Sequence, residues 1–406
     1  MYDGPPRRFI HKELAAHTSM SRLGIGVIGI GVAAANAHLP ALAASRDFEL
    51  LAIMDLDPAR VEYAGGRWPI AHTFTDLEAF FACPGIDAVV VATPPDSHLR
   101  ISQAALEHGK HVLTEKPLAS TLAQTLSMIE TAKNRNLCLC VGHEKRFHPT
   151  FERVRRLLQS SAIGAPYYCG VHWASNVKLD PEHLIPEGYR AGYEWRWRNT
   201  EIGGGIIQDH LPHYADLIRD WTNSTPVAVY CHSFNVARDL LDWPPEKAVW
   251  EDLGLVVVRF SNGLVMRFET GTTGRSLSPL MSMGSGIGEW TEYGYILGTK
   301  GQIIFDLMPW DSSENGRIAI WRVGEAVARD IGWSFVEQPE PKRREGSPAG
   351  ASHTMFAAQA REFAKAIRGE PSRIASGEDG AITVAAVDAA YLSARTHQEC
   401  PVAYPG

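Results

Sequence analysis

The first part of the chain alternates short apolar runs with amphipathic helical segments, and this alternation constrains the fold more than any other feature. The apolar runs are rich in Val, Ile and Leu and lie at Ile25–Ile30, Leu50–Met54, Ala88–Val91, His111–Leu113 and Leu137–Val141. Helical patterns separate them, for instance at Asp76–Phe81, Ser97–Glu107 and Leu122–Arg135. Buried strands that alternate with helices require right-handed crossovers, so we predict a doubly wound, parallel α/β sheet over residues 21–146.

The second half of the sequence follows a different pattern, in which strand-like segments are joined by short turns. The candidate strands are Tyr167–Ala174, Val227–Phe234, Leu253–Phe260, Leu264–Thr270, Tyr293–Leu297, Gln302–Asp306 and Arg317–Val323. The turn Ser261-Asn262-Gly263 is typical of a hairpin, and a helix is expected over 205–220. We therefore predict an α+β unit with a largely antiparallel open sheet over residues 147–375.

The two ends of the chain complete the expected organisation. Residues 1–20 are polar and without periodicity, and they lack the apolar region of an export signal, so we expect a flexible extension. Helical patterns at His353–Arg368 and Gly377–Arg395 follow an exposed loop at Glu337–Gly350. The segment 376–406, which holds the last of these helices, is expected to return toward the first unit.

Composition argues against several classes of function. A chain of 406 residues is long enough to bury two cores. Its formal charge of −7 gives no basic footprint for nucleic acid, and no apolar run approaches the roughly 20 residues of a membrane span. Six cysteines without a zinc-type spacing fit a reducing compartment. We expect a cytoplasmic protein that binds neither nucleic acid nor membrane.

A glycine-rich turn follows the first strand at Gly29-Ile30-Gly31-Val32-Ala33-Ala34. Gly29 would permit the tight turn, and Gly31 would let a pyrophosphate approach the backbone at a helix N-terminus. Asp55 ends the second strand, where a carboxylate accepts hydrogen bonds from ribose hydroxyls and repels a 2′-phosphate. The turn alone also fits a purely structural strand–turn–helix. Together with Asp55 it favours NAD over NADP, a preference that Arg60 would weaken.

Two more loops follow strands at the same edge of the predicted sheet. Thr93-Pro94-Pro95 leads into Ser97 and His98, and Glu115-Lys116-Pro117 ends the next strand. An open α/β sheet binds its ligand outside the carboxyl ends of its strands, so both loops are expected at the crevice. The first loop is alternatively a rigid turn with Ser97 as helix cap. Lys116 is expected to polarise a carbonyl or to stabilise a developing alkoxide.

The stretch 203–216 reads as a glycine turn that feeds a helix. Asp209 and His213 are four positions apart, which places a carboxylate and an imidazole on one helical face. With Lys116, this pair suggests an enzyme that removes a proton and a hydride from a secondary alcohol; a plain hydrogen-bonded pair is the structural alternative. His210 is turned about 100° from Asp209, so the three side chains are not expected to share a face, and no metal site is expected.

Aromatic and polar side chains elsewhere are candidates for a substrate cleft. The segment 189–198 alternates aromatic residues with arginines and includes Trp195 and Trp197. Such a segment suits the faces and hydroxyls of a pyranose or a larger glycoside, and equally a contact with another subunit. His172-Trp173 stands at the end of a predicted strand, and both residues are candidates for walls of the cleft. Glu144 would accept a hydrogen bond from a sugar hydroxyl or pair with Lys145.

These motifs together resemble the Gfo/Idh/MocA family of NAD(P)-dependent oxidoreductases. The matching segments are Gly29-Ile30-Gly31, Ala92-Thr93-Pro94, His98, Glu115-Lys116-Pro117, Arg146-Phe147-His148-Pro149, Gly203-Gly204-Gly205 with Asp209, His213 and Asp216, and Leu297-Gly298-Thr299-Lys300-Gly301. The resemblance covers nearly the whole chain after residue 20 and extends to the last helix, at Ala390-Tyr391-Leu392.

The resemblance implies roles for individual residues. Lys116 would contact the nicotinamide and the reacting hydroxyl, His213 would be the general base, and Asp209 would bind or orient the substrate. The cofactor would contact Gly29, Gly31, Val32, Ala33, Asp55, Thr93, Pro94, Pro95, His98, Glu115, Lys116 and Arg146. The substrate would contact Lys116, Glu144, Arg146, His172, Trp195, Trp197, Asp209, His210 and His213. Relatives commonly associate through an exposed sheet face, which implies a homodimer or homotetramer.

Three functions are compatible with these residues. The leading hypothesis is an NAD-dependent dehydrogenase that oxidises one ring hydroxyl of a sugar, glycoside or cyclitol to a ketone. A second is an NAD-dependent glycoside-cleaving enzyme that oxidises C3 only transiently. A third is a dinucleotide-sensing protein without turnover, which the presence of both Lys116 and His213 disfavours. The substrate class is left open because His210 and Pro212 depart from the residues usual in relatives, and His143-Glu144-Lys145 is a second departure.

Overall fold

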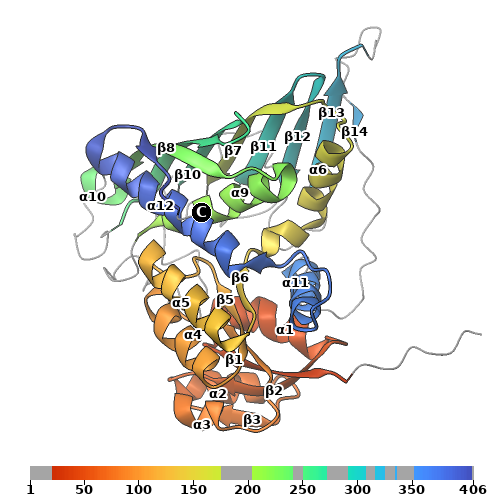
Figure 1. Ribbon diagram of the computed structural model, residues 1–406, viewed down its shortest axis with the longest axis vertical. Coiled ribbons are helices and arrows are strands. Elements are labelled where there is room, and N and C mark those ends of the chain that lie inside the picture. Colours follow the sequence, from red (N-terminus) through yellow and green to blue (C-terminus); the bar gives the residue numbers. More distant parts are fainter. Residues whose placement is uncertain are drawn as a thin grey trace, which may run out of the picture.

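The structure is a computed structural model that describes residues 21–174, 204–240, 250–271, 291–307, 316–324, 334–335 and 352–404. The described residues form two sheets, one below the other in Figure 1, with helices packed on each. The N-terminal extension 1–20 and the segment 189–198, with Trp195 and Trp197, lie outside the described residues. No helix among the described segments is long and apolar enough to span a membrane.

The first sheet confirms the predicted parallel, doubly wound architecture. Its parallel strands are β1 (Leu23–Ile28), β2 (Phe48–Met54), β3 (His72–Phe74), β4 (Ala88–Val91), β5 (His111–Glu115) and β6 (Leu139–Gly142). They are ordered β6-β5-β4-β1-β2-β3, and the two-residue β15 (Ala375–Ser376) adds an antiparallel edge beside β6. The order reverses between β1 and β4, which is the point where such sheets open a ligand crevice. The three-residue β3 was not predicted because it is too short and too exposed to show a periodic pattern.

Three of the helical segments on the first sheet begin at a side-chain cap. The helical segments are η1 (Ala34–His38), α1 (Leu39–Ala43), α2 (Pro58–Gly65), α3 (Leu77–Phe81), η2 (Pro95–Ser97), α4 (His98–Glu107) and α5 (Leu122–Arg135). Asp57, Asp76 and Thr121 each accept a main-chain N–H at the start of α2, α3 and α5. η1 directly follows the glycine turn and continues into α1, so the turn does open a helical segment as predicted.

The second sheet is largely antiparallel, also as predicted. Its strands are β7 (Pro166–Ala174), β8 (Pro226–Phe234), β9 (Leu253–Phe260), β10 (Val265–Gly271), β11 (Thr291–Gly298), β12 (Gly301–Leu307), β13 (Arg317–Arg322), β14 (Ser334–Phe335) and β16 (Cys400–Pro401). The order is β14-β13-β12-β11-β7-β10-β9-β8-β16, and β7 and β10 are the parallel pair among the described strands. Gly263 has a φ of +85° in the predicted hairpin between β9 and β10.

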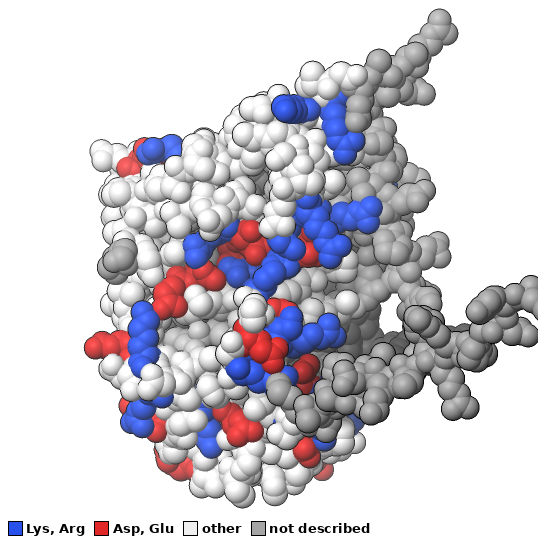
Figure 2. Space-filling view, turned by 45° about the vertical axis from the view of Figure 1, so that its right-hand side comes forward, with Lys and Arg blue, Asp and Glu red and all other residues white. Residues whose placement is uncertain are grey.

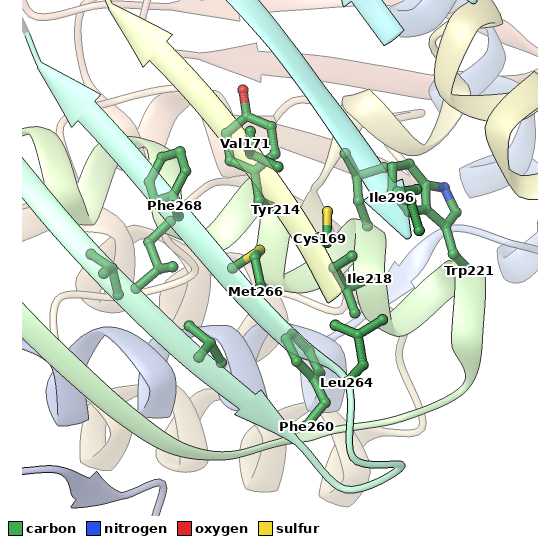
Figure 3. Packing of buried hydrophobic residues seen from close by; sticks show 14 of the residues in the cluster. Cys169, Val171, Tyr214, Ile218, Trp221, Phe260, Leu264, Met266, Phe268 and Ile296 are labelled. Carbon is green, nitrogen blue, oxygen red and sulfur yellow. The ribbon is translucent and has the colours of Figure 1, made fainter. Parts of the chain in front are cut away.

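One face of the second sheet packs against α6 (Pro149–Gln159), α9 (Ile206–Thr222) and α12 (Gly377–Thr396). Figure 3 shows Tyr214, Ile218 and Trp221 of α9 among inward-facing strand side chains such as Met266 and Phe268. Along β9, burial alternates with the period of two expected of a strand with one covered face. Val256, Val258 and Phe260 are buried, whereas Leu255 and Val257 are 42% and 38% exposed on the opposite face.

The C-terminal segment contacts both sheets. α11 (Ser352–Ile367) lies within the range 147–375 that the sequence analysis placed in the second unit, but Ala360, Phe363 and Ala364 pack into the core of the first sheet. The assignment of α11 to the second unit is therefore corrected. Its apolar stripe packs against residues of the first sheet such as Ile25 of β1 and Phe48 of β2. α12 contacts α5 and β6 of the first unit as well as β8 and α9 of the second.

Candidate active site

A cleft of about 1090 Å³ runs from the carboxyl ends of the first sheet to the N-terminal half of α9. At one end it is lined by the glycine turn, Asp55 and the proline loop after β4. At the other end it is lined by residues of both units, namely Lys116, Glu144, Lys145, Trp173, Gln208, Asp209, His210, His213 and Glu251. Its volume exceeds that of a typical small-molecule site and suits a dinucleotide together with a second ligand.

The glycine turn fits a pyrophosphate for two separate reasons. Gly29 has a φ of +87°, and a Cβ added there would lie 2.6 Å from Cγ2 of Thr93, so a side chain is excluded by conformation and by space. A Cβ added to Gly31 would meet no protein atom within 4 Å, so the backbone at Gly31 is open to the cleft. Val32 and Ala33 line the cleft beside it. The turn therefore leaves main chain accessible to a ligand where the sequence predicted phosphate contact.

Asp55 holds the glycine turn as well as lining the cleft. Its Oδ2 accepts a hydrogen bond of 2.7 Å from the main-chain N–H of Ile30, and its Oδ1 accepts one of 2.9 Å from that of Asp57. Each carboxylate oxygen retains further acceptor capacity for a ribose hydroxyl. Nη1 of Arg60 lies 3.8 Å from Oδ2, so the residue expected to weaken the NAD preference does stand beside Asp55.

The proline loop lines the cleft, but His98 does not. Thr93, Pro94 and Pro95 face the cavity, whereas His98 is fully buried, with its ring nitrogens 2.8 Å from the Thr93 oxygen and 2.9 Å from the Pro117 oxygen. Burial lowers the pKa of His98, so the neutral ring donates to one of these two carbonyls. The prediction of a direct cofactor contact is therefore corrected: His98 joins the two loops from behind because the first turn of α4 points it into the core.

Lys116 reaches from the first unit to the start of α9. Its Nζ donates a hydrogen bond of 2.8 Å to the main-chain oxygen of Asp209 and also contacts the Asp209 carboxylate. The preceding Glu115 accepts a hydrogen bond of 2.7 Å from Nε2 of His38, which lies in η1. Burial alone would raise the pKa of Glu115, but the contacts with His38 and Lys116 outweigh it and lower that pKa. A charged carboxylate thus fixes the strand end that carries Lys116.

The start of α9 is capped by two side chains that sequence reasoning missed. The Tyr391 hydroxyl accepts a hydrogen bond of 3.0 Å from the Gly205 N–H and donates one of 2.8 Å to Oε1 of Glu251. The same Glu251 oxygen accepts from the N–H of Ile207 at 2.9 Å. A Cβ on Gly204 would lie 2.1 Å from the Tyr391 hydroxyl oxygen, which explains the glycine there. Tyr391 comes from α12, and only the family resemblance of that helix pointed toward it.

His213 is buried and faces the cleft from α9, and 4% of its surface is exposed. Burial lowers the pKa of its imidazole well below the ordinary value, and the nearby charges of Lys116 and Lys145 lower it further. The ring is therefore neutral and able to accept a proton at working pH. Asp209, one turn earlier, lines the same cleft as predicted from its spacing to His213, and Lys116 lines it as well.

His210, which was predicted to contact the substrate, also lines the cleft, together with Asp209 and His213. Its ring packs on Trp173 of β7 with centroids 3.7 Å apart, and both residues line the cavity. His210 precedes His213 by three positions, so these two rings lie on neighbouring parts of one helix surface. Among the described residues, no group of three or more His, Cys, Asp or Glu side chains has a metal-binding arrangement.

The short helix η3 (Glu144–Phe147) turns successive side chains in three directions, as a 3₁₀ turn does. Glu144 faces the cleft, and Lys145 lines it while its Nζ donates to Glu292 at 2.5 Å. Arg146 points away into a buried network, where Nε and Nη2 donate to the two oxygens of Asp216 at 2.7 and 2.6 Å. The predicted contacts of Arg146 with cofactor and substrate are therefore corrected. Glu144 does not pair with Lys145, which was the alternative considered for it.

Like His98 and Arg146, His172 is a predicted site residue that does not line the cleft. Successive side chains of a strand point to opposite faces of the sheet, and in β7 it is Trp173 that faces the cleft. The His172 ring stacks on Tyr293 at 4.9 Å, and its Nδ1 lies 3.5 Å from Oε1 of Glu269. Of the two candidates His172 and Trp173, the structure therefore places Trp173 at the cleft and His172 on the other face of the sheet.

Charged side chains of both signs are interspersed over the face of the molecule that Figure 2 shows. Several charged side chains of the described residues pair, for example Arg373 with Glu152 at 2.6 Å and with Asp220 at 2.7 Å. This face therefore offers no broad positive surface, in line with the negative net charge.

Comparison with known protein families matches both halves of the chain. A model of the "Oxidoreductase family, NAD-binding Rossmann fold" matches residues 23–143, and a model of the "GFO/IDH/MocA C-terminal domain" matches residues 151–304. The two matches correspond to the first sheet with its helices and to the larger part of the second unit.

Individual proteins are similar at low identity. The uncharacterized oxidoreductase YdgJ of Escherichia coli is 31% identical over 47% of this chain and 51% of its own length, so the aligned part spans about half of that relative. The 1,5-anhydro-D-fructose reductase of Ensifer adhaerens is 27% identical over 93% of this chain and 98% of its own. A solved levoglucosan dehydrogenase in complex with NADH and levoglucosan has the same fold, with a TM-score of 0.77, 22% identity and coverage of 95% of this chain and 100% of that one.

Proposed function

Because the chain belongs to the Gfo/Idh/MocA family of NAD-binding oxidoreductases, we propose that it oxidises one secondary ring hydroxyl of a sugar, glycoside or cyclitol to a ketone. The observation that carries this proposal is the convergence of Lys116, Asp209 and His213 on one cleft that also contains the glycine turn. A cation and a neutral base side by side are what removal of a hydroxyl proton requires.

The NAD-binding part of the cleft is formed by Gly29, Gly31, Asp55 and the Thr93-Pro94-Pro95 loop. When bound there, the oxidised nicotinamide is the hydride acceptor. Asp55 would accept hydrogen bonds from the ribose hydroxyls, and the open main chain at Gly31 would lie against the pyrophosphate.

Proton removal is assigned to the residues of the second end of the cleft. Lys116 would donate to the substrate oxygen and lower the free energy of the developing alkoxide. His213 would accept the hydroxyl proton, since its lowered pKa keeps the ring neutral. Asp209 would hold the Lys116 ammonium in place through the contacts seen between them.

The aromatic wall favours a ring-shaped polyol as substrate. Trp173 and His210 present flat surfaces beside the hydrogen-bonding groups of the site, and such surfaces suit the C–H face of a pyranose or cyclitol. The carbohydrate names of two relatives, the anhydro-fructose reductase and levoglucosan dehydrogenase, point the same way.

The test is a panel of polyols, aldoses and glycosides with NAD and with NADP, followed by absorbance at 340 nm and by product analysis. We expect NADH to accumulate in step with a keto product for at least one cyclic polyol, with NAD preferred. Cleavage of a glycoside without net NADH would instead establish transient oxidation. Tight NAD binding without conversion of any compound would support a sensing role.

A further association is proposed for the face of the second sheet on which Tyr230, Leu255 and Val257 are exposed. Tyr230, Leu255 and Val257 are 43%, 42% and 38% exposed there, and we propose that this face joins two or four copies of the chain. Sedimentation of the wild type and of Leu255→Glu tests this, since a monomeric wild type would exclude it.

A further inference from the structure

Two buried polar atoms face each other at the reacting end of the cleft. Oε2 of Glu144 lies 3.9 Å from Nδ1 of His213. Within the described structure neither atom has a hydrogen-bond partner, and the two residues are only 5% and 4% exposed. Unpartnered polar atoms at such depth are costly and uncommon. Because these two atoms face each other at the candidate catalytic base, they suggest that Glu144 and His213 form a hydrogen bond during turnover.

The charges around His213 make it a poor final holder of a proton. The imidazole faces Lys116 from the loop after β5, Lys145 and His143 from the segment before α6, and His210 from its own helix. An imidazolium formed there would be buried beside two ammonium groups. Among the described residues, the carboxylate that lies within 4 Å of the His213 ring nitrogens is that of Glu144.

The surroundings of Glu144 differ from those of His213. Glu144 faces Glu115, which disfavours a second negative charge, and also Lys116 and Lys145, which favour one. α11 packs against η3 and contributes the uncharged ring of Phe356 to the cleft. Burial and the charge of Glu115 outweigh the two lysines and raise the pKa of Glu144 to about 8.

We propose that Glu144 is the positioning residue of His213 and the acceptor of the proton that passes through its ring. Its carboxylate accepts the Nδ1–H, which fixes the tautomer whose Nε2 is free to act as base. This inference rests on the proposed dehydrogenase function. The present separation would shorten by about 1 Å to reach hydrogen-bond distance, a tightening common when a site fills.

The proton transfer balances without any further reactant. The substrate O–H bond breaks as an N–H bond forms at Nε2 of His213. The Nδ1–H bond breaks as an O–H bond forms at Oε2 of Glu144, and the carbinol hydride leaves to the oxidised nicotinamide. The site ends with a neutral imidazole and a neutral carboxylic acid, so no buried imidazolium accumulates beside Lys116 and Lys145.

The kinetic test compares Glu144→Gln, Glu144→Asp and the matched control Glu78→Gln, whose carboxylate is 78% exposed on α3. For the wild type we expect kcat/KM to rise with pH through a limb near pH 8, where Glu144 ionises. Gln retains the shape and an acceptor but cannot take the proton, so we expect kcat to fall at least about tenfold and the limb to disappear. Glu144→Asp should restore part of kcat and the rise of kcat/KM with pH. The control Glu78→Gln should behave as the wild type.

A second readout needs neither cofactor nor substrate. The ¹⁵N resonances of the His213 ring, assigned by comparison with His213→Asn, report which nitrogen carries the proton in the free protein. Above pH 8, where Glu144 is ionised, its charge 3.9 Å from Nδ1 should favour Nδ1–H in the wild type, with a shift toward Nε2–H in Glu144→Leu. An unchanged pH profile in Glu144→Gln, or an unchanged tautomer in Glu144→Leu, would overturn the inference. If the wild type oxidises no substrate, the dehydrogenase proposal fails, while the NMR result still decides whether Glu144 sets the tautomer.

Discussion

The ammonium group of Lys116 donates a hydrogen bond of 2.8 Å to the main-chain oxygen of Asp209. Lys116 directly follows β5 of the parallel sheet, and Asp209 lies in the first turn of α9 on the antiparallel sheet. The contact therefore joins the two units where the proposed nucleotide-binding and substrate-binding parts of the cleft meet. The catalytic proposal depends on this closeness.

Replacing His213 by Ala should abolish most turnover and leave NAD binding unchanged. General-base catalysis is worth about 10² to 10⁴ in rate, and His213 lies at the far end of the cleft from the glycine turn. Turnover measured at 340 nm and NAD affinity measured by calorimetry together check this. A variant with the turnover of the wild type would exclude His213 as the base.

Lys116→Met should lower kcat by about 10² to 10³, because one preorganised donor to a developing oxyanion contributes that much. Lys133→Met is a suitable control, since the Lys133 side chain is 67% exposed. In Lys116→Met, kcat should fall while the free energy of unfolding changes little. If kcat survives in the Met variant, the alkoxide must be stabilised by another group, and Lys145 is the nearest candidate.

Asp55→Asn should weaken NAD binding more than NADP binding and so reduce the preference between the two cofactors. The amide keeps the shape but loses the negative charge that attracts ribose hydroxyls and repels a 2′-phosphate. Titration of both cofactors, followed by quenching of intrinsic fluorescence, measures the ratio. An unchanged ratio would mean that Asp55 serves only to hold the Ile30 and Asp57 main chain.

Arg146→Met should destabilise the fold without affecting the cofactor. Removing one partner of a buried ion pair costs about 3–5 kcal/mol, and Arg146 is bonded to Asp216 at two positions. Urea unfolding should show the loss, while the Kd for NAD of the folded variant stays near that of the wild type. Weaker NAD binding at normal stability would restore the direct role that the sequence suggested.

The pH dependence of stability provides a separate check on Glu144. Its pKa in the folded state is raised to about 8, so the folded protein binds this proton more tightly than the unfolded chain does. Its contribution to stability is therefore greatest in acid, declines as pH rises above the ordinary glutamate pKa, and levels off above pH 8. Glu144→Gln should remove that part of the decline in urea titrations between pH 5 and 9. If the free energy of unfolding varied with pH in the same way for the wild type and Glu144→Gln, that result would contradict a raised pKa of Glu144.

Much of the fold was predictable because its signals are local. Apolar runs, the turn after Gly29 and the four-residue spacing of Asp209 and His213 are visible in short windows of sequence. The misplaced residues depend on information that such windows do not contain. Whether His172 or Trp173 faces the cleft is a matter of strand register, and the direction of Arg146 depends on the 3₁₀ geometry of η3.

Other site features depend on segments that are distant in the sequence. The cap on α9 requires the Tyr391 hydroxyl from α12, and the placement of α11 depends on which sheet leaves an apolar face uncovered. Neither is encoded in a local pattern. The facing pair of Glu144 and His213 likewise appears only when η3 and α9 are brought together.

The most direct measurement follows a deuterium atom placed on the carbinol carbon of the fastest substrate from the panel. In a single turnover with excess enzyme and NAD, mass spectrometry of the recovered cofactor reads where that atom goes. We predict one deuterium in each reduced nicotinamide formed and a keto product in equal amount. Reduced cofactor without the label, or product formed with none of the label transferred, would contradict oxidation of a secondary alcohol at this site.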